Sequence, residues 1–127
     1  MNTQQPYSIK KMSPQFIVLS LEQSIEFYTS KLNFDIDFRY EDFYAGIIKN
    51  GCSIHLKLGK PYKEERGNKR HNQDLDITFT VDNIEHVYQA LLSKNVEMIQ
   101  PLRNMPYGKE FYIVDPDGYI IAFLEEA

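Results

Sequence analysis

The chain has 127 residues, 43% apolar and 25% charged, so we expect one core-forming domain over residues 1–127 and exclude a disordered or fibrous protein. Its formal net charge of −4 argues against nucleic acid as a partner. The polar N-terminus argues against a signal peptide, and the absence of a long apolar run argues against a membrane span. Cys52 is the single cysteine, which excludes an internal disulfide. These features predict a cytoplasmic protein.

The first half of the chain has the pattern of a strand, a helix and three further strands. Apolar residues Leu21, Ile25, Tyr28 and Leu32 recur at helical spacing. Apolar and polar residues then alternate, as in a half-buried strand, and Asn50-Gly51 predicts a hairpin between the last two strands. The expected segments are a strand at 14–19, a helix from 21 to about 33, and strands at 34–40, 44–49 and 53–58.

The second half repeats this pattern after a polar, charged segment. Residues 59–73 contain Pro61 and Gly67, which favours an exposed, irregular connector. The sequence Asp115-Pro116-Asp117-Gly118 predicts a turn between the last two strands. The expected segments are a strand at 75–81, a helix at 83–93, and strands at 96–100, 110–114 and 119–125.

The two halves are related in sequence as well as in pattern. At an offset of 63 residues, Leu21–Lys31 aligns with Ile84–Lys94, with apolar positions and the Ser-Lys ending in step. We therefore interpret residues of about 12–58 and 75–126 as two copies of one supersecondary unit. Neither copy can bury its apolar face alone, so the copies should pack around a shared surface, where function is expected.

Two motifs identify a family. They are Ser24-Ile25-Glu26-Phe27-Tyr28 and the run from Pro106-Tyr107-Gly108-Lys109-Glu110-Phe111 into Asp115-Pro116-Asp117-Gly118. With the repeat, they resemble the vicinal oxygen chelate superfamily of glyoxalase I, extradiol dioxygenases, fosfomycin-resistance enzymes and bleomycin-resistance proteins. The resemblance implies an α+β fold in which two tandem βαβββ repeats form a curved eight-stranded mixed sheet with a central cleft. It also implies a homodimer.

Enzymes of the family bind a metal at four cleft positions, which correspond here to Ser13, His55, Asp76 and Ala122. Such a site needs about three good ligands, whereas Ala122 has no donor atom and Ser13 is a weak one. We therefore expect no metal and no cofactor, and we interpret His55 as a cleft histidine that is hydrogen-bonded to a neighbour such as Asp76. Glu110 is a candidate replacement for the missing carboxylate.

Without a metal, the cleft resembles that of bleomycin-resistance proteins, which sequester a drug in an aromatic groove. This implies an antibiotic-resistance role and a small aromatic or cationic ligand. Aromatic faces would stack on the ligand, and Glu110 would be the charged contact. The expected ligand-binding residues are Phe38, Tyr40, His55, Asp76, Tyr107, Glu110 and Tyr112.

Three alternatives remain open at this point. The first is a metal-dependent enzyme of glyoxalase or dioxygenase type with a reduced ligand set. The second is a metal-free enzyme in which His55 is a general base oriented by Asp76, although no nucleophile motif supports it. The third is an interaction module without small-molecule activity.

Overall fold

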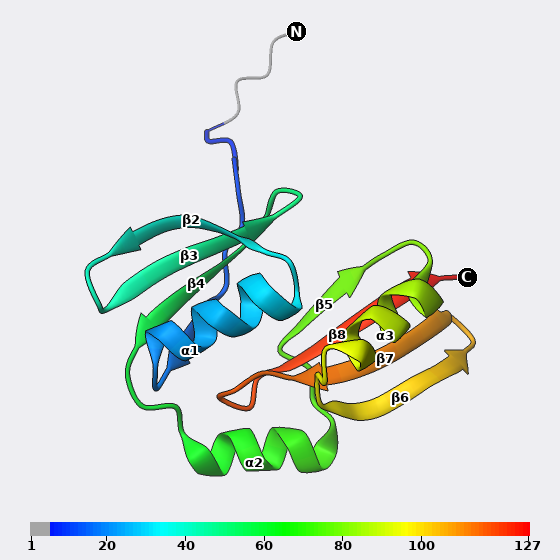
Figure 1. Cartoon of the computed structure of the whole chain (residues 1–127). Helices are drawn as coiled ribbons and strands as arrows, with labels where there is room; N and C mark the ends of the chain where they lie inside the picture. The colour runs from blue at the N-terminus through cyan, green and yellow to red at the C-terminus, as the bar shows by residue number, and fades with distance from the viewer. Residues whose placement is uncertain (1–5) are drawn as a thin grey trace, which may run out of the picture.

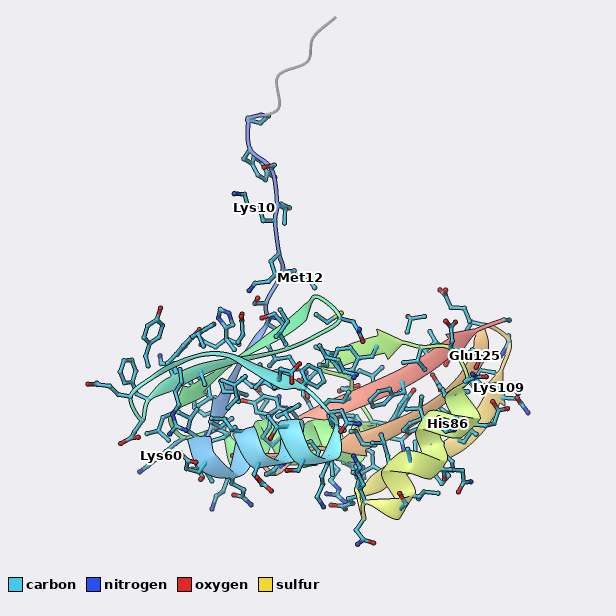
Figure 2. All side chains as sticks on the ribbon, turned by 45° about the horizontal axis from the view of Figure 1, so that its top comes forward. Lys10, Met12, Lys60, His86, Lys109 and Glu125 are labelled. Carbon is cyan, nitrogen blue, oxygen red and sulfur yellow. The ribbon has the colours of Figure 1, made fainter. Side chains whose placement is uncertain are left out.

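The computed structural model describes residues 6–127. The polar start of the chain, from which we expect no signal peptide, lies mostly in residues 1–5, outside the described part. None of the helices in residues 6–127 is long and apolar enough to span a membrane. Two modules of sheet and helix lie beside each other (Figure 1). An exposed segment that includes Lys10 and Met12 extends away from both (Figure 2).

The first module has the predicted order of elements. They are β1 (Gln15–Val18), α1 (Leu21–Glu26), the π-helical turn η1 (Phe27–Lys31), β2 (Asp35–Tyr40), β3 (Tyr44–Lys49) and β4 (Cys52–Leu58). The strands form a sheet in the order β1-β4-β3-β2, in which β1 is parallel to β4 and the other pairs are antiparallel. The Ser20 side chain caps α1 by accepting a hydrogen bond from the backbone N–H of Gln23.

The second module repeats the first. Its elements are β5 (Ile77–Thr80), α3 (Ile84–Ser93), β6 (Met98–Met105), β7 (Gly108–Val114) and β8 (Ile120–Glu126). The order β5-β8-β7-β6 and the parallel pairing of β5 with β8 match the first sheet. β6 is longer than the predicted strand, because it continues through residues 101–105 to a tight turn into β7.

The segment between the modules corrects one prediction. Residues 59–73 are mostly exposed, as expected, but they contain a helix, α2 (Lys63–Asn72). Acidic residues lie in the first turn of α2 and basic residues in the last, which complements the helix dipole, and Gln73 ends the helix in a left-handed conformation. The buried side chain of Arg66 attaches α2 to the second module, which offsets the low helix propensity of Gly67.

The helix-facing sides of the two sheets share one core. Phe16 of β1 stacks on Tyr119 with ring centroids 4.1 Å apart, and the Tyr119 hydroxyl donates to the carbonyl of Ile17 and accepts from its N–H, both at 2.8 Å. These contacts join β1 to the chain just before β8. Four phenylalanines are buried or partly buried in this core: Phe16, Phe27, Phe79 and Phe123.

The α+β class and the tandem βαβββ arrangement are therefore confirmed. The eight strands form two four-stranded mixed sheets, which are not closed into a barrel. The register also reproduces the sequence repeat, because Gln15 pairs with His55 in the first sheet as Thr78 pairs with Ala122 in the second. The four cleft positions inferred from the repeat are thus equivalent in the structure.

Candidate functional site

An aromatic cluster lies on the first sheet, on the face away from α1. The register places Tyr40 opposite Tyr44, and both Phe38 and His55 opposite Gly46. The Phe38 ring lies 5.4 Å from that of Tyr40, 6.0 Å from Tyr44 and 5.2 Å from His55, measured between centroids. A Cβ at Gly46 would be 2.2 Å from the Phe38 ring, so the glycine makes room for this packing.

Hydrogen bonds fix the orientation of His55 in this cluster. The Gln15 side-chain amide donates to the Tyr44 hydroxyl at 3.1 Å, and that hydroxyl lies 2.8 Å from Nδ1 of His55. Because the hydroxyl accepts from Gln15, its own proton is free to point to Nδ1, which favours the His55 tautomer that carries its proton on Nε2. The partner of His55 is therefore Tyr44, and the expected contact with Asp76 is absent.

A second cluster, which we call the Glu110 cluster, lies on the second sheet. Glu110 is only 4% exposed. It accepts a hydrogen bond from Arg103 Nε at 2.8 Å, and it accepts from the hydroxyls of Tyr107 and Tyr112 at 2.8 and 3.0 Å. The Arg103 guanidinium also lies 5.5 Å from the centre of the Tyr112 ring. The cluster is therefore an internally paired polar network.

The electrostatics of the Glu110 cluster follow from these contacts. Burial alone would raise the pKa of Glu110, but hydrogen bonds from Tyr107, Arg103 and Tyr112 outweigh burial and hold this pKa below its usual value. Glu110 is thus ionised, yet its charge is compensated by Arg103. This corrects the expectation that Glu110 offers a free negative charge to a cationic ligand.

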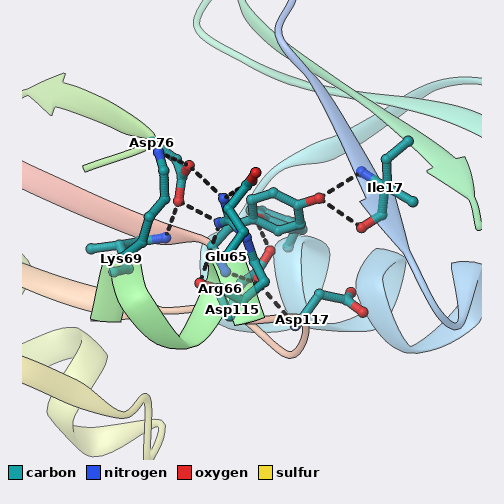
Figure 3. A network of polar contacts seen from close by, with 11 residues as sticks. Ile17, Glu65, Arg66, Lys69, Asp76, Asp115 and Asp117 are labelled. Atoms are coloured by element: carbon teal, nitrogen blue, oxygen red, sulfur yellow. Dashed lines mark hydrogen bonds and ion pairs between the residues drawn. The ribbon is translucent and has the colours of Figure 1, made fainter. Parts of the chain in front are cut away.

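Asp76 belongs to a third group of residues (Figure 3). Its carboxylate accepts from Arg66 at 2.8 and 3.2 Å, from Lys69 at 2.9 Å and from the backbone N–H of Ile120 at 2.8 Å. The Arg66 guanidinium also stacks over the Tyr119 ring, 4.2 Å from its centre. Although burial opposes ionisation, these donors hold the pKa of Asp76 below its usual value. Each oxygen of the Asp76 carboxylate thus accepts two hydrogen bonds, which leaves no acceptor position for a ligand or for His55.

The four metal positions do not fit a metal. Ala122 is a buried methyl group, and the Asp76 carboxylate is saturated by its donors. Ser13 and His55 remain as one neutral oxygen and one imidazole, too few ligands for a divalent ion. Throughout residues 6–127, no three His, Cys, Asp or Glu side chains are grouped as metal ligands, so Glu110 does not complete a set.

The predicted ligand-binding residues are therefore divided. Phe38, Tyr40 and His55 meet on the first sheet, whereas Tyr107, Glu110 and Tyr112 meet on the second and Asp76 pairs with α2. Among the described residues, no hydrogen bond, ion pair or ring contact joins the aromatic cluster to the Glu110 cluster. Sequence reasoning missed Arg103 and Arg66. The signal for Arg103 was its place directly opposite Glu110 once β6 is extended to Met105.

Comparison with known proteins identifies the family. The family model described as glyoxalase/bleomycin resistance protein/dioxygenase superfamily matches residues 13–123. The chain belongs to this superfamily. A search of the curated proteins found no match.

Several solved structures share the fold of this superfamily member. UcmS2 is 21% identical with a TM-score of 0.76, over 94% of this chain and 100% of that chain. The bleomycin-binding protein of Streptomyces verticillus, complexed with copper(II)-bleomycin, is 17% identical with a TM-score of 0.69, over 95% and 99%. The fosfomycin resistance protein FosX of Listeria monocytogenes is 15% identical with a TM-score of 0.70, over 95% and 96%. Structures with this fold thus include a bleomycin-binding protein and a fosfomycin resistance protein.

Proposed function

We propose that this superfamily member is a metal-free protein that binds and sequesters a planar aromatic small molecule. The observation that carries the proposal is the aromatic cluster, in which Tyr40 is 60% exposed beside Phe38 and His55. Exposed aromatic faces on a rigid sheet suit stacking on a flat ligand. The Nε2–H of His55 adds a polar contact that would orient the ligand.

Within residues 6–127, the lack of a metal ligand set favours binding over metal-assisted chemistry. A metal would need at least one further carboxylate or imidazole near His55, and both carboxylates inferred for the cleft are paired with arginine. A cationic ligand is not favoured, because Arg103 already compensates Glu110. We therefore propose an uncharged or weakly charged aromatic compound.

The proposed groove needs a second chain. The aromatic cluster and the Glu110 cluster lie on separate sheets, and β2 and β6 are at the ends of the sheet orders. Ile36 and Tyr40 are both exposed on β2, an edge strand, although a bulge between Ile36 and Phe38 places them on opposite faces of the sheet. We propose a homodimer in which the Glu110 cluster of one chain faces the aromatic cluster of the other, which encloses a ligand between them.

Sedimentation is expected to give twice the 15.0 kDa mass of one chain at micromolar concentration. Ile36→Asp should shift the mass towards the monomer, because it places a charge on the edge strand β2, where Ile36 is exposed in the single chain. Leu92→Asp is the matched control, since Leu92 is an exposed leucine on α3, outside the proposed interface. A monomeric wild-type protein, or an equal shift with both variants, would contradict the proposed dimer.

The ligand surface can be tested with Tyr40→Ala, screened with planar aromatic antibiotics by calorimetry. The variant is expected to bind about five- to tenfold more weakly, because a lost stacking contact corresponds to roughly 1–1.4 kcal/mol. Phe43→Ala is the control, as Phe43 is similarly exposed but makes no ring contact with the cluster. The ligand should be recovered unchanged, and chelator should not affect binding. Turnover of the ligand, or binding that requires a metal, would instead indicate an enzyme.

A separate experiment tests whether each groove is formed by the Glu110 cluster of one chain and the aromatic cluster of the other. Tyr40→Ala and Tyr107→Ala chains should each bind poorly, but a mixture should regain binding sites, because a mixed dimer contains one groove with both native tyrosines. Both side chains are exposed, so neither change should unfold the protein. If each groove is formed within one chain, mixing will restore nothing.

A further inference from the structure

A cavity of about 360 Å³ lies where the two modules meet, separate from both side-chain clusters described above. Its wall is formed by the end of η1, the β3–β4 turn, the end of β5 and α3. Its lining is mostly apolar, and Phe34, Phe79, Leu91 and Phe123 are among the lining residues. Phe34 and Phe79 come from different modules and contact each other with ring centroids 5.9 Å apart. We call this space the seam cavity.

Three lysines surround the seam cavity: Lys31, Lys49 and Lys94. Lys31 and Lys94 are equivalent in the sequence repeat, and they make reciprocal contacts. The Lys31 ammonium donates to the carbonyl of Lys94 at 3.0 Å, and the Lys94 ammonium donates to the carbonyl of Ser30 at 3.1 Å. Each lysine therefore caps the helix end of the other module.

These caps leave the positive charge uncompensated. Lys94 makes one further bond, to the Asn33 side-chain oxygen at 3.2 Å, and Lys49 makes a single long bond of 3.4 Å to the Asn33 carbonyl. All of these acceptors are uncharged. In residues 6–127, none of the three lysines forms an ion pair. An ammonium has three N–H donors, so donors remain for a ligand.

We propose that the seam cavity binds a small carboxylate with an apolar tail. The tail would lie against the phenylalanines, and the carboxylate would accept charge-assisted hydrogen bonds from the lysines. The volume is near the lower end of the range of about 300–1,000 Å³ for small-molecule sites. In a chain of net charge −4, three lysines without acidic partners favour an anion at this place. The site is distinct from the groove proposed for the aromatic ligand.

Binding of decanoate, measured by calorimetry, tests the charge and the cavity. Decanoate is expected to bind the full chain, whereas decanol, which has the same tail without the charge, should bind at least about tenfold more weakly. Lys49→Gln should weaken decanoate binding by about the same factor, because it removes one of the charged donors. The fold should be unaffected, since Lys49 makes only one long hydrogen bond within the protein. Lys63→Gln, an exposed lysine on α2, is the control and should bind like the wild type.

Cavity filling tests the position of the ligand. Ala90 is an exposed residue of α3 that lines the cavity, so Ala90→Phe should occupy the space without changing the core and should abolish binding. Cys52, the only cysteine, is exposed and also lines the cavity. Bound decanoate should therefore slow alkylation of Cys52 by iodoacetamide.

The outcomes separate this site from the proposed groove. Decanoate binding that survives Tyr40→Ala but is lost in Lys49→Gln and Ala90→Phe supports the seam cavity. Equal binding of decanoate and decanol, unchanged alkylation of Cys52, or loss of binding in Tyr40→Ala alone would overturn it. The absence of any decanoate binding to the wild type would overturn it as well.

Discussion

Replacing Asp76 with alanine is expected to lower the free energy of unfolding by about 3–5 kcal/mol, the range for breaking a buried ion pair by removal of one partner. The Arg66 and Asp76 side chains are 10% and 9% exposed, and α2 contacts the second module through this pair. Without the carboxylate, the Arg66 guanidinium keeps only its contacts with Glu65, the Gly118 carbonyl and the Tyr119 ring. Urea unfolding followed by circular dichroism measures the loss.

A double substitution distinguishes a broken pair from a general packing defect. Arg66→Met combined with Asp76→Leu removes both charges and keeps apolar volume, so it should be much less destabilising than Asp76→Ala alone. Lys69→Met is a milder control, because Lys69 is 31% exposed and contributes one of several bonds to Asp76. If the double variant is as unstable as Asp76→Ala, the loss of the Asp76 partner of Arg66 is not the cause.

The internal repeat explains why the fold could be predicted. The offset that aligns Lys31 with Lys94 also places these residues at equivalent helix ends, where each caps the other. Hydrophobic periodicity and turn residues are local signals, and all eight predicted strands occur. The exception is α2, because Pro61 and Gly67 favoured an irregular connector. Pro61 lies outside the helix, and the tertiary contact of Arg66 decides the conformation.

The site could be predicted only in part, because the partners of its charged residues come from distant elements. Phe38, Tyr40 and His55 meet on one sheet face, as alternation along β2 and β4 suggests. The pairing of Glu110 depends on where β6 places Arg103, and that of Asp76 depends on α2. From the sequence alone, the carboxylates of Asp76 and Glu110 are expected to be available to a ligand. In the structure both carboxylates are compensated, which narrows the expected ligand from an aromatic or cationic compound to an uncharged or weakly charged aromatic one.

Asp115 is a buried carboxyl group in the turn between β7 and β8, at the contact between the modules. It is 5% exposed, and it accepts a hydrogen bond from the Tyr28 hydroxyl at 2.6 Å and from the backbone N–H groups of Asp117 and Tyr119, both at 2.9 Å. Burial raises the pKa of Asp115 to about 6, although these hydrogen bonds oppose the effect. The folded protein therefore holds the proton of Asp115 more tightly than the unfolded chain.

The consequence is a loss of stability as pH rises. A carboxyl group whose pKa is about 6 when folded and 3.8 when unfolded contributes its full stabilisation below pH 4 and loses it as the pH approaches 6. The difference corresponds to about 3 kcal/mol, at about 1.4 kcal/mol per pKa unit. Asp76 and Glu110 affect stability in the opposite direction, because their pKa values are lowered in the folded protein. Their contributions to stability are lost only as the pH falls to more acidic values.

Unfolding by urea at several pH values between 4 and 7, for the wild type and Asp115→Asn, isolates this contribution. Asparagine keeps an oxygen that can accept from the backbone N–H groups of Asp117 and Tyr119 but does not titrate. The stability of the wild type relative to Asp115→Asn should therefore fall by up to about 3 kcal/mol across this range. A stability difference that stays constant with pH would show that Asp115 ionises with the same pKa in the folded and unfolded chain. In that case, hydrogen bonds to the carboxylate fully offset the effect of burial.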